Sequence, residues 1–330
     1  MRAPTTLGRT LATLAALVAL ACAAFALSLA SGSVRVGASD ILAAMAGNAD
    51  AEAATVVREL RMPRTVAAFA VGALLALAGA LMQVLLRNPL ADPYILGISG
   101  GAAVGSLAAL VIGAAAFVAP AAFVGALAST LIVFALARGE VERAVWAPTR
   151  LLLTGVVIAS GWSAIIALML VLAPATQIKG MIYWLLGDLS SAGDPSIPIV
   201  VLVITLMAAL AIARDLNALA RGHFDATAVG VDVGRTSFVI YVIAAIATSA
   251  AVVTAGSVGF VGLIVPHAIR LAFGNDQRLL LPASAAAGGT LLVIADTGAR
   301  TLFAPIELPV GVVTALIGVP AFLVLLNRGR

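Results

Sequence analysis

Long apolar runs alternate with short polar connectors along almost the whole chain of 330 residues. A helix needs about 20 mostly apolar residues to cross a bilayer, and it satisfies its own backbone groups there. Membrane β-strands are instead about 9–11 residues long and alternate in polarity, unlike these unbroken runs. The pattern predicts an all-α integral membrane protein, one membrane domain over 1–330, with about ten transmembrane helices. They are predicted near 10–30, 65–85, 95–113, 117–137, 150–172, 196–213, 236–255, 258–273, 280–297 and 309–326.

The composition agrees with this class and excludes several others. The chain is 62% hydrophobic and 10% charged, whereas soluble domains are about 45–50% apolar and about 25% charged. Cys22 is the only cysteine, and His223 and His267 are the only histidines. We therefore expect no disulfide framework and no metal site. No basic run with interleaved aromatic residues suggests a nucleic-acid partner.

The first apolar run, from about residue 11 to 29, follows Arg2 and Arg9 and allows two interpretations. A cleaved secretory signal has an apolar core of about 7–15 residues. This run is longer, which favours a retained first transmembrane helix over a cleaved signal.

The basic residues predict the orientation, because cytoplasmic loops of membrane proteins are enriched in Lys and Arg. An even number of spans puts both termini on one side. With the termini inside, six of the 19 basic residues fall outside: Arg35, Arg58, Arg61, Arg64, Lys179 and Arg300. Both termini are therefore predicted to be cytoplasmic.

Three connectors are long enough to hold structure of their own. On the outside, 32–64 predicts two short interfacial helices, in DILAAMAG and ATVVRELRMPRT. The outer connector 176–194 carries Tyr183 and Trp184, which favour the membrane–water boundary. On the inside, 214–235 predicts two short helices separated by a glycine turn and projecting into the cytoplasm.

The stretch RNPLADPYILGISGG, residues 87–101, interrupts the apolar pattern after the second span. Pro89 and Pro93 are expected to stop the helix, since proline cannot donate a backbone hydrogen bond. The side chains of Asn88 and Asp92 are expected to satisfy the freed backbone groups. The stretch is therefore predicted to be an inner turn.

Glycines follow in a regular pattern, because Gly97, Gly101 and Gly105 recur every four residues. They would form a smooth strip on one helix face, which is typical of close packing between membrane helices. The same strip could line a translocation path, and the two roles are compatible.

A second glycine-rich stretch, TAGSVGFVGLIVPHAIRL, contains Gly259 and Gly262 before Pro266, His267 and Arg270. Pro266 is expected to end or kink the helix, and Arg270 to lie at the inner headgroup level. His267 and Arg270 have no carboxylate or nucleophile near them in the sequence. A structural role is therefore predicted rather than a catalytic one.

Few ionisable residues fall within the spans, where such residues usually mark ion pathways. Asp296 and Arg300 lie four apart near an outer helix end and can pair. This argues against a proton- or sodium-coupled carrier. A Walker A loop ends in Gly-Lys-Ser/Thr, but the only lysine, Lys179, follows Ile178. A nucleotide that drives this chain must therefore be bound by a partner. A secondary transporter or channel stays open as the alternative.

Four stretches together resemble the FecCD family of permease subunits from ABC importers for ferric siderophores, haem and cobalamin. They are LRMPRT, GALLALAGALMQVLLRNPLADPYILGISGGAA, GSVGFVGLIVPHAIR and ELPVGVVTALIGVPAF, in the family's order from about residue 61 onwards. The resemblance implies a type II ABC importer permease with ten helices in the bacterial inner membrane. It also implies no cofactor on this chain, and no enzymatic activity of its own.

The resemblance further implies partners. A second copy of the chain or a paralogous permease would form the path at the subunit interface. Two ATPase subunits would bind ATP and Mg and dock on the 214–235 segment. A periplasmic binding protein would deliver the chelate, which the motifs leave open among cobalamin, ferric siderophore and haem.

By motif position, the resemblance assigns roles to individual residues. Binding-protein docking falls to Arg61, Arg64 and Arg300. ATPase coupling falls to Asn217, Leu219, Arg221, Gly222, Val229, Gly230 and Arg235. The inner gate falls to Asn88, with Gly97, Gly101, Gly105, Gly259 and Gly262 as further candidates for the pathway.

Overall fold

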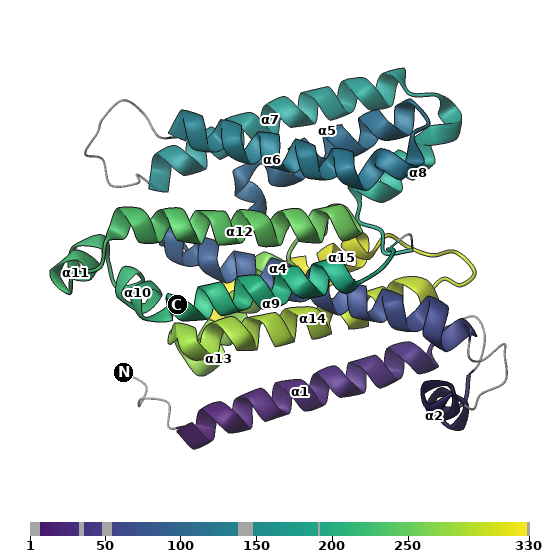
Figure 1. Cartoon of the computed structure of the whole chain (residues 1–330), viewed down its shortest axis with the longest axis horizontal. Coiled ribbons are helices and arrows are strands. Elements are labelled where there is room, and N and C mark those ends of the chain that lie inside the picture. The colour runs from purple at the N-terminus through teal and green to yellow at the C-terminus, as the bar shows by residue number, and fades with distance from the viewer. Residues whose placement is uncertain (1–6, 33–35, 48–54, 138–147, 191, 329–330) are drawn as a thin grey trace.

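The computed structural model describes residues 7–32, 36–47, 55–137, 148–190 and 192–328. Its helices run side by side in an elongated bundle (Figure 1). Five arginines used in the orientation prediction lie outside the described residues: Arg2, Arg35, Arg138, Arg143 and Arg330.

Ten helices form the body of the bundle. They are α1 (Leu7–Ala30), α4 (Met62–Leu85), α5 (Ile98–Val111), α6 (Val118–Ala137), α7 (Pro148–Leu172), α9 (Ser196–Ala211), α12 (Val233–Ala255), α13 (Val261–Phe273), α14 (Gln277–Thr301) and α15 (Val310–Arg328). Among the described residues, six helices are long and apolar enough to cross a membrane, or seven if α9 and α10 form one bent span. The helices α5, α13 and α15 are apolar but shorter. Each predicted span thus corresponds to one helix.

Short elements lie in the connectors. They are α2 (Ala38–Ala46), α8 (Ala175–Leu185), α10 (Ala213–Leu219), α11 (His223–Ala228), the π-helix η1 (Val56–Arg61) and the 3₁₀ turns η2 (Pro93–Leu96) and η3 (Ala115–Phe117). The prediction of two interfacial helices in 32–64 was right for α2 only. The second stretch, ATVVRELRMPRT, runs through η1 directly into α4. The π spacing extends to the N–H of Met62, which donates to the carbonyl of Val57 five residues earlier, and Pro63 after it has no N–H to donate.

Helix α4 is the centre of the bundle, and it is apolar on all sides because it is buried on all sides. It packs against α14, α12, α13 and α9. Two glycines allow this approach. Gly72 lies against the carbonyl of Gly288, and Gly79 lies against the carbonyl of Gly262. Small residues at such crossings bring backbones together where no hydrophobic force between helices acts.

Helix α13 continues through Pro266, so of the two outcomes predicted for this proline, ending the helix is not observed and a kink stays a prediction. Proline removes the hydrogen bond to the carbonyl four residues earlier, which is that of Gly262. The backbone of α4 packs against this carbonyl at Gly79. In the same turn, the carbonyl of Leu263 accepts a hydrogen bond from the side chain of Gln83 at 3.1 Å. Contacts with α4 therefore support the turn that Pro266 weakens.

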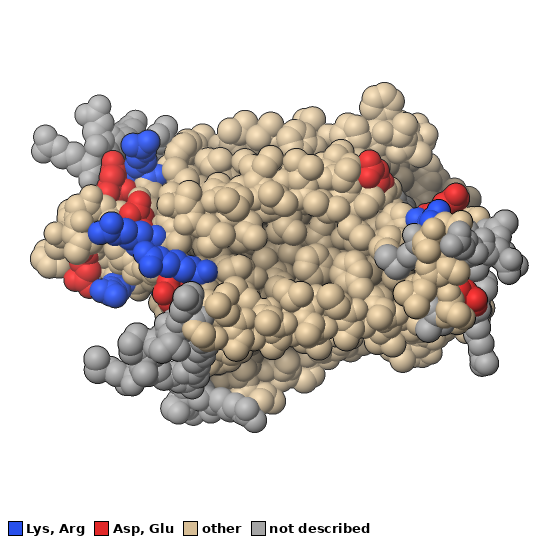
Figure 2. Space-filling view, turned by 60° about the horizontal axis from the view of Figure 1, so that its bottom comes forward, with Lys and Arg blue, Asp and Glu red and all other residues tan. Residues whose placement is uncertain are grey.

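The two ends of the bundle differ (Figure 1). The helices α10 and α11 lie at the end where α1 begins and α15 ends, and α2 and α8 lie at the opposite end. Figure 2 shows charged residues gathered at the two ends, with an almost uncharged face between them. This distribution fits a protein whose middle is covered by lipid. We call the α10–α11 end the inner end and the other the outer end.

Candidate functional site

The helices α10 and α11 form an exposed projection at the inner end, as the pattern of 214–235 predicts. Helix α10 bends away from α9 by 62°, and Gly222, with φ 148°, separates it from α11. Gly230 has φ 84° and ends the second short helix. Both glycines adopt backbone angles that side chains disfavour. The chain then enters α12, whose first turn is capped by Asp232.

Two of the predicted coupling residues anchor this projection rather than extend from it. Asn217 donates to Asp276 at 2.9 Å and accepts from the backbone N–H of Gln277 at 2.9 Å. Leu219 is fully buried. Asn217 and Leu219 therefore tie α10 to the start of α14 and to the core.

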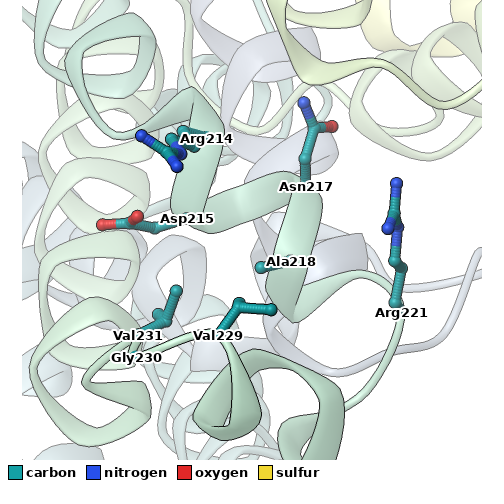
Figure 3. A pocket seen from close by; sticks show the side chains of 8 residues that line it. All are labelled: Arg214, Asp215, Asn217, Ala218, Arg221, Val229, Gly230 and Val231. Carbon is teal, nitrogen blue, oxygen red and sulfur yellow. The ribbon is translucent and has the colours of Figure 1, made fainter.

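Of the other predicted coupling residues, Gly222 is buried and the rest are exposed. Arg221, Val229 and Arg235 are exposed, and Val229 is 72% exposed. Together with Arg214 and Asp215, several of them line a cavity of about 530 Å³ between α10 and the segment that joins α11 to α12 (Figure 3). Phe224 on α11 is 86% exposed, although sequence reasoning missed it. The sequence signal that could have identified it is an aromatic residue within a short polar segment, where the side chain has no core to enter.

The inner turn after α4 has the geometry that its residues predict. Asn88 accepts a hydrogen bond from the backbone N–H of Leu90 at 2.9 Å. Asp92 accepts one from Tyr94 at 2.8 Å and so caps η2, which begins at Pro93. Whether Asn88 also acts as a gate stays a prediction.

Tyr94, which sequence reasoning did not single out, joins this turn to the break between α12 and α13. Its hydroxyl donates to the carbonyl of Val258 at 3.1 Å and accepts from the N–H of Val258 at 3.0 Å. The ring of Pro93 lies against Gly262 in the same region. Two non-helical segments inside the bundle thus satisfy each other, which membrane-depth backbone requires.

The glycine strip of α5 contacts α6. An added Cβ at Gly101 would meet the carbonyl of Gly125, and one at Gly105 would meet the carbonyl of Ala121. Gly97 precedes the helix with φ 68°, and its carbonyl accepts from Ser129 at 2.8 Å. The packing role is therefore the one observed for these glycines, and the pathway role stays a prediction.

Gly259 differs from the other pathway candidates, because no atom lies within 4 Å of the position its Cβ would take. It lines an apolar cavity of about 560 Å³ with Phe260, Leu316 and Val319. Phe260 has φ 70°, a strained value for an aromatic residue. Strain of this kind is concentrated at functional sites, so this cavity is the stronger candidate for a pathway face.

The three arginines predicted for docking are engaged within the chain. Arg61 donates to the carbonyl of Leu29 at 2.6 Å. Arg300 donates to the carbonyls of Ser28 and Ser31 at 2.7 and 3.0 Å. These bonds satisfy carbonyls at the end of α1, where cations are favoured. Sequence reasoning missed this role because the partners are more than 30 residues away.

Arg64 belongs to the same cluster at the outer end. Its guanidinium is 2.9 Å from Asp296 and 2.8 Å from Glu307. Asp296 also lies 3.5 Å from Arg300, so the predicted pair between these two residues is confirmed. A cavity of about 470 Å³ borders Arg61, Arg64 and Arg300. All three therefore have structural partners, and docking of a binding protein stays a prediction.

The structure gives His267 and Arg270 different surroundings. Arg270 donates to Gln83 at 2.7 Å and to Asn275 at 3.0 Å, which links α13 to α4. The Nδ1 atom of His267 is buried without a hydrogen-bond partner among the described residues. The described residues contain no group of three or more His, Cys, Asp or Glu side chains that could hold a metal ion.

A bundle with six or seven described helices that are long and apolar enough to cross a membrane is the architecture of a multi-pass membrane protein. The chain matches the FecCD transport family over residues 19–328 and belongs to that family.

Two relatives and one solved structure illustrate the match. The chain is 44% identical to the cobalamin import system permease protein BtuC of Halobacterium salinarum, covering 83% of this chain and 74% of the relative. It is 40% identical to the hemin transport system permease protein HmuU of Yersinia pestis, covering 82% and 83%. The structure is similar, with TM-score 0.85 and 26% identity, to an inward-facing transporter described as of metal-chelate ABC type, covering 96% and 98%.

Proposed function

We propose that this chain is the membrane-spanning permease subunit of an ATP-driven importer for a bulky metal chelate. The observation that carries the proposal is the family match over residues 19–328. Relatives named for cobalamin and for hemin transport support a chelate as the substrate class. Few ionisable residues fall within the predicted spans, and a bare ion would need coordinating groups along its path, which favours a bulky ligand.

The energy source in this proposal is a partner. Lys179 is the only lysine and does not follow a glycine, so the chain has no Walker A loop. The exposed α10–α11 pair is the candidate docking surface for an ATPase subunit that binds ATP and Mg. This assignment makes the inner end cytoplasmic, with both termini on the cytoplasmic side of the bacterial inner membrane.

We expect Phe224→Ala to weaken retention of the ATPase subunit on the purified permease by on the order of tenfold. Buried aromatic anchors dominate protein interfaces, and Phe224 is the most exposed large apolar side chain of the projection. The measurement is co-purification of the ATPase with tagged permease. Phe303→Ala is the matched control, because Phe303 is 63% exposed at the outer end. Equal retention by the two variants would contradict the assignment.

Transport in this proposal occurs by alternating access between two permease subunits, either two copies or a paralogous pair. The apolar cavity beside Gly259, formed by α15, the end of α8 and the break before α13, is the candidate face of the shared path. A periplasmic binding protein would deliver the chelate to the outer end. The permease forms and breaks no bonds of its substrate.

The proposal is tested by uptake into proteoliposomes that contain this chain, its ATPase and its binding protein. Labelled cobalamin, a ferric siderophore and haem are supplied in parallel, with and without ATP. We expect ATP-dependent uptake of one of the three. Uptake that persists without the ATPase would favour a secondary transporter or channel instead.

A further inference from the structure

A second cavity at the inner end has a different chemistry from the α10–α11 cavity. It has a volume of about 300 Å³ and is lined by Gln83, Val84, Arg87, Pro89, Ala220, Arg270 and Asn275. These residues come from the end of α4, the turn that follows it, the residue after α10, the last turn of α13 and the α13–α14 connector. Two of them are arginines, and none of them is a carboxylate.

The charge of Arg270 is not neutralised by any carboxylate among the described residues. It is partly buried, and its two observed bonds go to the neutral side chains of Gln83 and Asn275. Guanidinium has five N–H donors, so three of them are left for another acceptor. A cation removed from water without a counter-ion is costly, and an anion in the cavity would offset that cost.

Arg87 supplies a second guanidinium to the same cavity. Its side chain is exposed and forms no hydrogen bond or ion pair within the described part of the chain. The side chains of Asp225 and Arg87 both lie near the position that a Cβ of Gly222 would take, at 3.9 and 3.8 Å. The two side chains form no ion pair with each other. Arg87 has φ 49°, a left-handed value. It lines the cavity without an ion-pair partner among the described residues.

We infer that this cavity binds a phosphate group. Two guanidinium groups match the oxygens of a phosphate with paired N–H donors, and the volume exceeds what a lone carboxylate needs. The cavity lies between helix ends at the level of Arg270, where the headgroups of the inner leaflet would lie. Basic pockets between membrane helices on this side typically take anionic lipid headgroups. The inference rests on the proposed function in one respect only, which is the assignment of this end of the bundle to the cytoplasmic side of the membrane.

The test uses the full chain, purified in detergent and depleted of lipid. Two probes are titrated separately, short-chain phosphatidylglycerol and inorganic phosphate, and binding is followed by native mass spectrometry and by the thermal midpoint. We expect Arg87→Gln to weaken binding by about tenfold or more, since a charge-assisted hydrogen bond is lost. Arg270→Gln should do the same, but it also removes bonds to Gln83 and Asn275.

Arg278→Gln is the matched control, because Arg278 is exposed at the same end but does not line the cavity. The affinity of the Arg278→Gln variant for the probes should be within about twofold of that of the unchanged chain. This change is well below the tenfold loss expected for a residue of the cavity. Tight binding of phosphatidylglycerol without binding of inorganic phosphate would identify the ligand as a lipid headgroup. Equal affinity for the two probes, with competition between them, would identify it as free phosphate. Equal weakening by Arg87→Gln and Arg278→Gln, or no binding of either probe, would overturn the inference.

A further arm adds the ATPase subunit. Displacement of the bound lipid from the unchanged chain would mean that the ATPase covers or fills the cavity in the assembled transporter, and the inference would then hold for the permease before assembly. Because the readout is binding, this result is separate from the uptake assay. Either experiment can fail while the other succeeds.

Discussion

Replacing Gly79 with alanine is expected to destabilise the bundle more than a typical single substitution. An added Cβ would overlap the backbone carbonyl of Gly262, so α4 and α13 would have to separate. Backbone atoms cannot move aside as a flexible side chain can. We expect a cost of about 3 kcal/mol, at the upper end for overpacking. This should lower the midpoint of thermal aggregation in detergent by on the order of 5–10 °C.

The matched control for this substitution is Gly298→Ala. Gly298 lies in α14, where an added Cβ would make an ordinary contact of 3.6 Å with Leu302. Alanine is favoured over glycine in a helix by about 1 kcal/mol. We therefore expect an unchanged or slightly higher midpoint. If Gly79→Ala unfolds at the same temperature as Gly298→Ala, the close approach of α4 to α13 is not as described.

A second large effect is expected for Asp296→Asn. Asp296 is 1% exposed, accepts hydrogen bonds from Arg64 at 2.9 and 3.1 Å, and lies near Arg300. The substitution leaves two guanidinium groups without their shared carboxylate. Removing one partner of a buried ion pair costs about 3–5 kcal/mol, because the remaining charge stays buried. The loss should appear in the same thermal assay.

Glu307→Gln is the control for this cluster, since Glu307 pairs with the same Arg64 at 2.8 Å but is 46% exposed. Water screens an exposed pair, so its loss should cost about 1 kcal/mol or less. Each of the two variants removes one negative charge that is paired with Arg64. Equal effects of the two substitutions would show that burial does not decide the strength of this cluster.

The cluster also explains how α1 is held to the bundle. Arg61 and Arg300 donate to the carbonyls at the end of α1, and Ser28 bonds to Thr65 at 2.7 Å. Helix α1 packs on α14. Two of the three arginines that resemble docking residues by motif position, Arg61 and Arg300, are therefore also residues that fasten the first helix. Variants at these positions would change stability before they reported on docking.

Several features of this protein follow from the sequence alone, because each depends on residues close together along the chain. The apolar runs near 65–85 and 280–297 are long enough to span, and helices α4 and α14 occupy them. The two short helices between Arg214 and Arg235 can be predicted from the polarity of this segment and from the glycine at position 222. The bonds of Asn88 and Asp92 to nearby backbone groups are likewise local. Family membership also follows from these short, ordered motifs.

Only the tertiary structure decided which residues meet across the bundle. Arg64 and Asp296 are 232 residues apart, and Tyr94 and Val258 are 164 apart. No local pattern predicts such a pairing, because it depends on how the helices cross. The same applies to Gly101, whose neighbour α6 was not evident from its spacing, and to Arg87 and Arg270, which meet at one cavity. The sequence determines which segments enter the membrane, and helix packing determines which of their side chains are left to bind something else.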